Sequence, residues 1–433
     1  MVEQLAAGVR GTLSPVGVGF NLVNTIIGSG ILALPYAMKE AGFYFGIFLM
    51  IAVAALAWAS LNTLIYSGRR VGLYKYESVS EAALGQSGRY LLTFALAVNS
   101  VGSCISYLII IGDTATPIVQ GIFGQSVFTS RQTVIAVAAT GFTLPLLFFR
   151  TLAPLVRASV ASTLCLPFIV AIVAVRGPAY RVTPAPTPVF GPSVLPALGV
   201  IAFAYSCTQV CYQSYGTLER KTLAGWSRAS GFAVGLAVAI YLAFSIISYQ
   251  SFGLETQPNL LNNFASDDTL ANVARALLAF SLTLTYPMQF YPIRDLFGES
   301  LGLSLDAQLP QQRSWFHALT MLLFGATLAV ALTVDDLGFV FKLIGTGASS
   351  LLVLGLPGII YLRVASPYLR RKTSDAVTGE TTSLLGPAHS DSSDDVAIIS
   401  EPRTSLVSVF LLALGIAVFI IGTWTSINEF VSS

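Results

Sequence analysis

Long uncharged runs of apolar residues recur along the chain, and most reach the length of about 18 residues that a helix needs to cross a bilayer. The first run is longer than the apolar part of a signal peptide, so we expect it to stay as the first span. The pattern predicts an all-α polytopic membrane protein of eleven transmembrane helices. Their ranges are near 15–37, 43–67, 90–112, 132–149, 153–175, 193–217, 229–251, 272–293, 314–334, 338–362 and 404–428.

The first span carries polar residues that a helix in plain hydrocarbon avoids. Asn21, Asn24, Thr25 and Gly28 follow one another at i, i+3, i+4 and i+7, so they share one helical face. The stripe runs into Gly28-Ser29-Gly30, where helix propensity is poor. This pattern predicts an interrupted helix, which transporters use to expose backbone amides to a solute near the middle of the membrane.

We expect the interrupted first span to bind a solute. Backbone N–H groups of Gly28, Ser29 and Gly30 would hold a substrate carboxylate, helped by a half-helix dipole. Asn24 and Thr25 would supply oxygens to a cation or contact the solute, together with Asn21 on the same face. The alternative is that the small residues only allow close helix packing, but amide side chains in hydrocarbon need polar partners.

The sixth span contains a second polar island, Tyr205 to Cys211, inside an apolar run. Cys207, Thr208 and Gln209 are candidates to face the substrate, with Thr208 and Gln209 lining the pocket. For Cys207 and Cys211, the favoured interpretation is that both pack as small apolar residues.

Two later spans carry further candidates. Ser281, Thr285 and Gln289 form one stripe in span eight, and their hydroxyl oxygens suit a small cation. Bonding of these hydroxyls back to their own helix is an equal alternative. Lys342 in span ten is interpreted as snorkelling to the outer boundary.

The spacing of the spans predicts an internal repeat. Ten core spans within 15–365 divide into two repeats of five, about 15–175 and 193–362, which would have opposite orientations in the membrane. Interrupted helices at matching positions of two halves are typical of inverted-repeat transporters. The eleventh span, 404–428, follows separately.

The positive charges predict the orientation. With the N-terminus in the cytosol, 17 of the 23 Lys and Arg residues fall on the cytosolic side. The cytosolic parts then include residues 1–14, a connector at 68–89 with a short amphipathic helix, and a Ser/Thr/Asp-rich loop at 366–403 that we expect to be disordered.

The 366–403 loop contains a candidate sorting signal. Glu380 lies four residues before the pair Leu384 and Leu385, the arrangement of an acidic dileucine signal read by vesicle adaptor proteins. A chance match in a Ser/Asp-rich segment is the alternative.

Composition agrees with the membrane assignment and excludes other classes. The chain of 433 residues is 54% hydrophobic and 10% charged with a mean hydropathy of +0.74, whereas soluble domains carry about 25% charged residues. No basic cluster with interleaved aromatic residues points to nucleic acid. Two histidines and four cysteines in apolar stretches offer neither a metal site nor an enzyme's catalytic groups. We expect no cofactor beyond a coupling ion. We expect the protein to be embedded in the lipid bilayer.

Five segments of the chain carry a family resemblance. The most specific is the first-helix segment 21–42, Asn-Leu-Val-Asn-Thr-Ile-Ile-Gly-Ser-Gly-Ile-Leu-Ala-Leu-Pro-Tyr-Ala-Met-Lys-Glu-Ala-Gly. The others are Thr143–Arg150, Ala202–Cys207, Trp226–Arg228 and Leu284–Gln289. Together they resemble the amino acid/auxin permease family, most closely its sodium-coupled neutral amino acid transporters and fungal vacuolar amino acid transporters. After the Cys207 position many relatives have one or two histidines, whereas this chain has Thr208 and Gln209.

The resemblance implies a leucine-transporter-like fold with two inverted five-helix repeats, and proton- or sodium-coupled movement of amino acids. Its coupling-ion positions correspond to Asn24 and Thr285, and its carboxylate site to the Gly28–Gly30 backbone. Ser281 is a further candidate for ion coupling, from the polar stripe of span eight alone. We therefore expect a secondary active transporter of neutral or polar amino acids, in a vacuolar or lysosome-like membrane or the plasma membrane. A membrane amino-acid sensor with little flux is the alternative.

Overall fold

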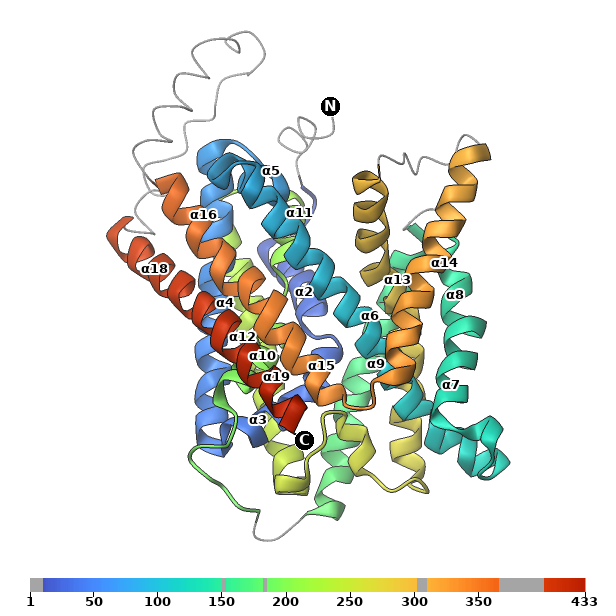
Figure 1. The fold of residues 1–433 in the computed structure, drawn as a ribbon. Helices are drawn as coiled ribbons and strands as arrows, with labels where there is room; N and C mark the ends of the chain where they lie inside the picture. Colours follow the sequence, from blue (N-terminus) through green and yellow to red (C-terminus); the bar gives the residue numbers. More distant parts are fainter. Residues whose placement is uncertain (1–10, 150–152, 182–184, 302–309, 366–400, 433) are drawn as a thin grey trace.

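The computed structural model describes residues 11–149, 153–181, 185–301, 310–365 and 401–432. These residues form long helices that run roughly side by side, with α5 at the end of the molecule where α4 meets α6 (Figure 1). The helices of the first half are α2 (Pro15–Ile26), α3 (Leu34–Ala41), α4 (Phe43–Val71), α5 (Tyr76–Leu84), α6 (Gln86–Phe123), α7 (Arg131–Ala138), α8 (Leu144–Leu147) and α9 (Ala153–Arg176).

The second half is also built from helices. Its helices are α10 (Val194–Ala204), α11 (Cys211–Gly216), α12 (Leu223–Phe252), α13 (Thr269–Ser300), α14 (Pro310–Thr333), α15 (Leu337–Ile344), α16 (Leu356–Ala365), α18 (Glu401–Ala417) and α19 (Thr423–Ser432). The 3₁₀ segments are η1 (Ser29–Ala33), η2 (Val127–Thr129), η4 (Gly177–Tyr180), η5 (Thr208–Val210), η6 (Gly253–Glu255) and η7 (Leu260–Asn263). The π-helical turns are η3 (Ala139–Thr143), η8 (Gly345–Ser349), η9 (Leu351–Gly355) and η10 (Val418–Gly422).

Helices lie at each of the eleven predicted ranges within the described part of the chain. Seven of them are long and apolar enough to cross a membrane, and the bent pair α2 and η1–α3 would make an eighth. The helices at 131–147 and 164–180 are apolar but shorter, and α13 carries polar residues and two prolines through its middle. The structure therefore confirms an all-helical protein with many membrane-length helices.

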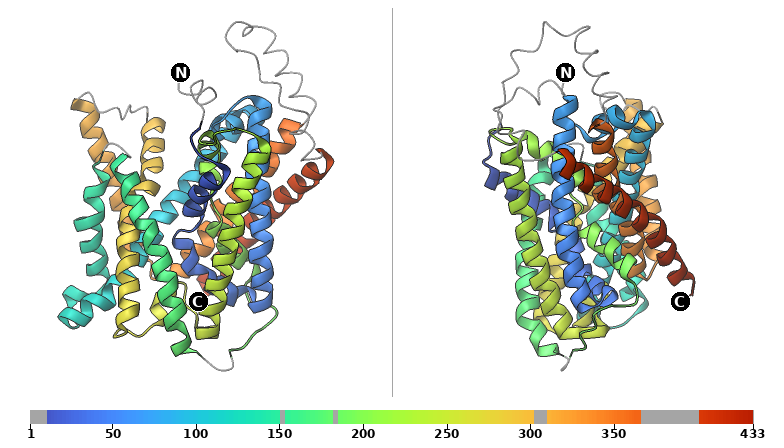
Figure 2. Two further views of the ribbon diagram at one scale, coloured as in Figure 1. Left: turned by 180° about the vertical axis from the view of Figure 1, so that it is seen from behind. Right: turned by 90° about the vertical axis from the view of Figure 1, so that its left-hand side faces the viewer.

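The helices pack in two groups that α6 crosses obliquely, as the views in Figures 1 and 2 show. On one side α12 packs along α2 and α4, and α16 packs on α4 and α18. On the other side α13 packs along α6 and α9, with α14 and α7 outside. The predicted short helix in the 68–89 connector is confirmed as α5.

Two expectations for the C-terminal part change. The predicted disordered loop extends to residue 403, but α18 already begins at Glu401, and residues 366–400 lie outside the described part of the chain. Lys342 does not snorkel, because its side chain is buried and lies 2.8 Å from carboxylate oxygens of both Glu40 and Glu429. Glu429 lies on α19, so this ion cluster joins the last helix to α3 and α15.

Candidate functional site

The first predicted interruption is present. The α-helix ends at Ile26, Ile27 and Gly28 leave the helical conformation, and η1 begins at Ser29. The two helical parts are bent by 58° at this point. A sequence of three residues with poor helix propensity explains why the chain breaks here rather than earlier in the apolar run.

The second predicted interruption is also present. The sixth span is helical up to Ala204, is irregular from Tyr205 to Cys207, and resumes as η5 and α11. The two breaks touch, since a Cβ atom on Gly30 would lie only 2.9 Å from the Cα atom of Ala204. Gly30 therefore permits a backbone approach that a larger residue would prevent.

A cavity of about 470 Å³ lies beside the two breaks. Its walls come from both interrupted helices and from α5, α6, α9 and α13, which are far apart in the sequence. Exposed residues of α5 and α11, Glu77 and Gln213, belong to its lining, so the cavity reaches the surface at the α5 end. The remaining polar lining residues are Asn24, Thr25, Tyr76, Asn99, Ser100, Tyr107, Ser162, Gln209, Ser281, Thr285 and Gln289.

Two acceptor oxygens in the cavity wall lack hydrogen-bond partners among the described residues. They are Asn24 Oδ1 on α2 and Gln209 Oε1 on η5, and both are buried from solvent. The Gln209 amide N–H donates to Ser206 O at 3.4 Å, which leaves its oxygen free. Buried acceptors are normally satisfied, so these oxygens suit an N–H donor or a cation in the cavity.

The polar stripe of α13 reaches the cavity with its hydroxyl groups already bonded. Ser281 Oγ lies 2.7 Å from Ser162 Oγ on α9, and Thr285 Oγ1 donates to Ser281 O at 2.9 Å. Bonding of Thr285 back to its own helix is thus what the structure shows. Because each hydroxyl uses its proton to donate, the oxygen lone pairs remain able to accept or to coordinate.

The structure brings six of the predicted site residues to the cavity wall. They are Asn24, Thr25, Gly28, Gln209, Ser281 and Thr285.

The other predicted site residues lie elsewhere. Asn21 is exposed one turn before the break, Cys207 is buried, and Thr208 Oγ1 donates to Leu352 O at 3.1 Å. Gly30 packs on Ala204, and Ser29 contributes the first backbone unit of η1. The predicted sorting signal Glu380, Leu384 and Leu385 lies outside the described residues.

Sequence reasoning missed the contribution of α5 and α6. Asn99 and Ser100 form a polar island inside the apolar α6, a signal of the same kind as those used in spans one and six. Asn99 Oδ1 accepts a hydrogen bond from Ser349 on η8 at 2.9 Å. Tyr76 on α5 is buried, and this burial raises its pKa well above 10, so it presents a neutral hydroxyl.

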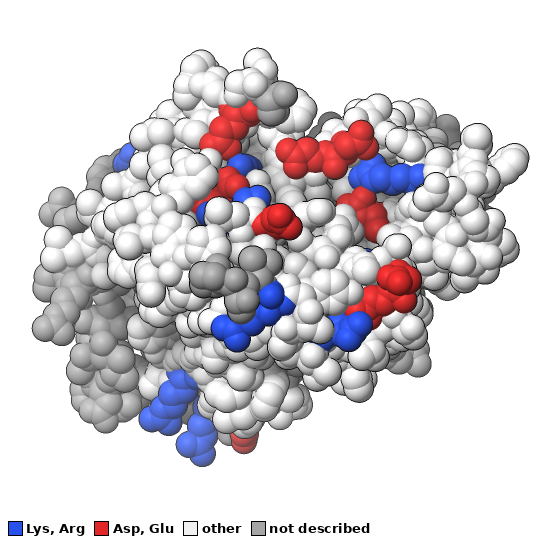
Figure 3. Space-filling model, turned by 90° about the horizontal axis from the view of Figure 1, so that it is seen from below, with Lys and Arg blue, Asp and Glu red and all other residues white. Residues whose placement is uncertain are grey.

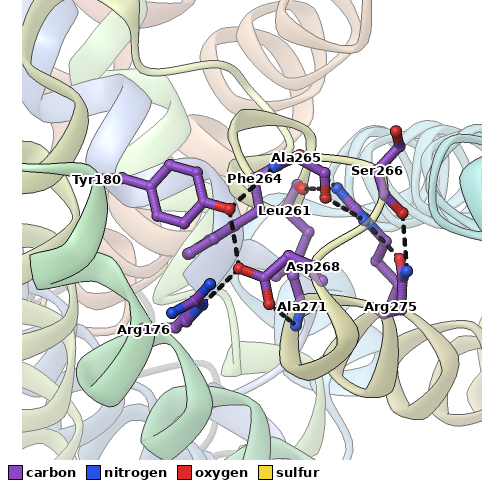
Figure 4. Close-up of polar contacts among 10 residues, drawn as sticks. Arg176, Tyr180, Leu261, Phe264, Ala265, Ser266, Asp268, Ala271 and Arg275 are labelled. Carbon is purple, nitrogen blue, oxygen red and sulfur yellow. Dashed lines mark hydrogen bonds and ion pairs between the residues drawn. The ribbon is translucent and has the colours of Figure 1, made fainter.

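A loop joins α12 to α13 at the opposite end of the molecule from α5. Figure 4 shows the two side chains that hold this loop, Asp268 at the loop's end and Arg275 on α13. The buried Arg275 guanidinium donates to three backbone oxygens, at 2.9 Å to Leu261, 2.6 Å to Phe264 and 3.1 Å to Ala265. The loop also reaches α3, because Lys39 Nζ donates to Thr256 O at 3.4 Å.

Asp268 is the second side chain that holds this loop. Burial disfavours its charge, but hydrogen bonds from Arg176 at 2.5 Å, the Ala271 N–H at 3.1 Å and Tyr180 at 2.8 Å outweigh burial and lower the pKa of the carboxyl below 3.8. Figure 3 shows this end of the molecule, where charged side chains of both signs lie among uncharged ones. The loop is therefore anchored by polar contacts on both α9 and α13.

A polytopic helical protein with a polar cavity between two interrupted helices has the architecture of a small-solute membrane transporter. Comparison with known proteins specifies the family. Residues 11–376 match the family described as "Transmembrane amino acid transporter protein". The chain belongs to this family, and it is a multi-pass membrane transporter rather than an enzyme.

Individual relatives agree over most of their length. The chain is 33% identical over 378 residues, 84% of this chain and 81% of the relative, to a rat protein named "Putative sodium-coupled neutral amino acid transporter 11". It is 28% identical over 367 residues, 80% and 75% of the two chains, to yeast "Vacuolar amino acid transporter 2". A solved structure of a substrate-bound, outward-open Na⁺-coupled sialic acid symporter covers 96% of this chain and 90% of its own, with a TM-score of 0.49 and 14% identity.

Proposed function

We propose that this protein is a secondary active transporter that moves neutral or polar amino acids, driven by H⁺ or Na⁺ and needing no other cofactor. The observation that carries the proposal is the meeting of two interrupted helices at one polar cavity. Interrupted helices at matching positions of two repeats are the sites of solute and ion binding in transporters that work by alternating access.

We also propose a specific arrangement of the membrane spans. Eleven spans, arranged as two inverted repeats of five and one additional helix, are supported by helices at every predicted range. The breaks after Ile26 and Ala204 fall in the first helix of each proposed repeat. Rocking of one helix bundle around these breaks would open the cavity to each side in turn.

The cavity is proposed to face the cytosol in this structure. It reaches the surface beside α5, in the connector that the Lys/Arg bias assigns to the cytosolic side together with the N-terminus. At the far end, polar contacts join separate elements: Lys39 binds the α12–α13 loop, and Lys342 joins Glu40 to Glu429. An outward-facing state would require contacts at that end to separate.

Substrate and ion would share the cavity. The start of η1 at Ser29 has no side-chain cap, so its first N–H groups would offer donors and a positive dipole end to an α-carboxylate. The free oxygens of Asn24 and Gln209 would accept from an ammonium or amide group, or Asn24 would join Ser281 and Thr285 around the coupling ion. The polar lining suits neutral polar side chains.

The names of two relatives support amino acids as the substrate and the vacuole as the location. One is named for sodium-coupled neutral amino acid transport and another for vacuolar amino acid transport. We therefore place this protein in a vacuolar or lysosome-like membrane, with adaptor proteins as candidate partners of the 366–403 loop.

Site variants in proteoliposomes test the proposal, each with a matched control. Asn24 and Thr285 line the cavity. Their variants Asn24→Ala and Thr285→Ala should each reduce ion-dependent uptake of a labelled neutral amino acid by about tenfold, as expected for loss of a positioned polar ligand. Asn21→Ala and Thr283→Ala make the same chemical changes outside the lining, on the same helices, and should leave uptake nearly unchanged. Unchanged ion dependence in both cavity variants would remove the coupling assignment.

A further inference from the structure

The two interrupted helices meet at one side chain from a third helix. Tyr241 lies on α12 and is fully buried. Its hydroxyl oxygen is 2.6 Å from Ile26 O and 3.0 Å from Ala204 O. Ile26 is the last residue of α2 and Ala204 the last of α10, so one phenol reaches the carbonyl end of both helices.

The electrostatics of this meeting point are unusual. The last carbonyl groups of a helix have no partner within it and carry a partial negative charge of about half an elementary charge. Two such ends converge here, away from water, on a single O–H group. Because a hydroxyl has one proton, it cannot donate fully to both oxygens at once.

Few other hydrogen-bond donors reach Ile26 O and Ala204 O. Ile26 O also accepts from the Gly28 N–H at 2.9 Å, whereas Ala204 O has no second donor among the described residues. The Tyr205 ring packs edge-on against Tyr241 with centroids 5.1 Å apart, and the Tyr205 hydroxyl has no partner among the described residues. The Tyr241 proton is thus the positive partner that both carbonyl groups share.

We propose that the Tyr241 hydroxyl is a positioning group that links α2 to α10, and that its proton occupies the place a small cation would otherwise take between Ile26 O and Ala204 O. In this conformation the hydroxyl is closer to Ile26 O than to Ala204 O, so the stronger hydrogen bond is the one to the end of α2. Given the proposed transport function, withdrawal of α2 during the cycle would transfer the bond to Ala204 O, so the hydroxyl remains paired in both conformations.

Three tyrosine-to-phenylalanine variants isolate this role. Tyr241→Phe frees the two carbonyl groups. Tyr212→Phe removes a buried phenol bond of the same length, 2.6 Å to Leu64 O, which joins α11 to α4 and involves neither Ile26 O nor Ala204 O. Tyr205→Phe removes a hydroxyl that has no partner, from the ring that packs on Tyr241.

The first measurement is the thermal midpoint of each purified protein in NaCl or LiCl against N-methylglucamine chloride at equal ionic strength. Tyr241→Phe should show a cation-dependent rise larger than that of the wild type, because Na⁺ or Li⁺ can bind the two freed oxygens. Tyr212→Phe and Tyr205→Phe should respond as the wild type does. A Tyr241→Phe response equal to that of Tyr212→Phe would overturn the proposal, whether or not the protein transports amino acids.

The second measurement is uptake into proteoliposomes. Tyr241→Phe should lower the maximal rate about tenfold below that of Tyr212→Phe, the effect of one unsatisfied buried polar group, and added Na⁺ or Li⁺ should restore part of it. A merely structural loss would not be restored by an ion. Wild-type protein that transports no amino acid would refute the proposed function, whereas equal rates in Tyr241→Phe and Tyr212→Phe would refute this inference alone.

Discussion

Replacement of Lys342 by methionine should destabilise the protein more than any other single change in its ion cluster. Lys342 lies between two carboxylates, at 2.8 Å from Glu40 and 2.8 Å from Glu429. The side chains of Lys342 and Glu40 are each 10% exposed, while that of Glu429 is 34% exposed. Lys342→Met would leave two neighbouring negative charges without their shared cation, with only the Ser193 hydroxyl still donating to Glu429.

The expected loss in the free energy of unfolding depends on how deeply each charged side chain of the cluster is buried. Removing one partner of a buried ion pair destabilises by about 3–5 kcal/mol, because the other charge stays buried and unpaired. Glu429→Gln leaves the balanced pair of Glu40 and Lys342 and removes a partly exposed charge, so its effect should stay below about 1 kcal/mol. The double variant Lys342→Met with Glu40→Gln should recover part of the loss.

The free energy of unfolding in detergent micelles, obtained from denaturant titration followed by circular dichroism, measures these differences. Lys39→Met is the matched control, since Lys39 is on the neighbouring α3 and donates to a backbone oxygen, Thr256 O at 3.4 Å. Equal losses in Lys342→Met and Lys39→Met would refute the reasoning. So would a Glu429→Gln variant as unstable as Lys342→Met.

Three further changes test other parts of the fold. Gly30→Ala should destabilise by about 1–3 kcal/mol because its Cβ would lie 2.9 Å from Ala204 Cα, whereas Gly28→Ala, with nothing within 4 Å, should unfold at nearly the wild-type temperature. Asp268→Asn should lower the melting temperature at neutral pH. Because the folded pKa lies below 3.8, the carboxylate stabilises above that pH, so the difference from wild type should vanish on acidification through the folded pKa. Arg275→Met should speed amide hydrogen exchange in the 253–268 loop at least tenfold, as carbonyl groups lose their donor; exchange as slow as in the wild type would show that the loop is held by other contacts.

The helices and both breaks could be predicted because their signals are local. An apolar run needs only its own length to predict a span, and Gly28-Ser29-Gly30 weakens the helix where it stands. The polar stripe of α2 likewise predicted that Asn24 and Thr25 would face a cavity.

The ion cluster and part of the cavity lining could not be predicted, because they depend on how helices far apart in the sequence pack together. Nothing in the sequence around Lys342 shows that Glu40 and Glu429, far away in the chain, would surround it. Thr208 looked equivalent to Gln209, but a rotation of the chain through η5 turns one toward Leu352 O and the other into the cavity. The contribution of Asn99 was missed because α6 has no break to draw attention to it.

Gradient-driven accumulation distinguishes a secondary active transporter from a protein that only binds amino acids. Purified wild-type protein in proteoliposomes would be supplied with a panel of labelled amino acids under an imposed pH gradient, an imposed sodium gradient, or neither. A secondary active transporter should accumulate a neutral or polar amino acid above its external concentration with one of the gradients, and the accumulation should collapse when that gradient is dissipated. Saturable binding of the amino acid with no accumulation under either gradient would contradict transport and indicate a sensor.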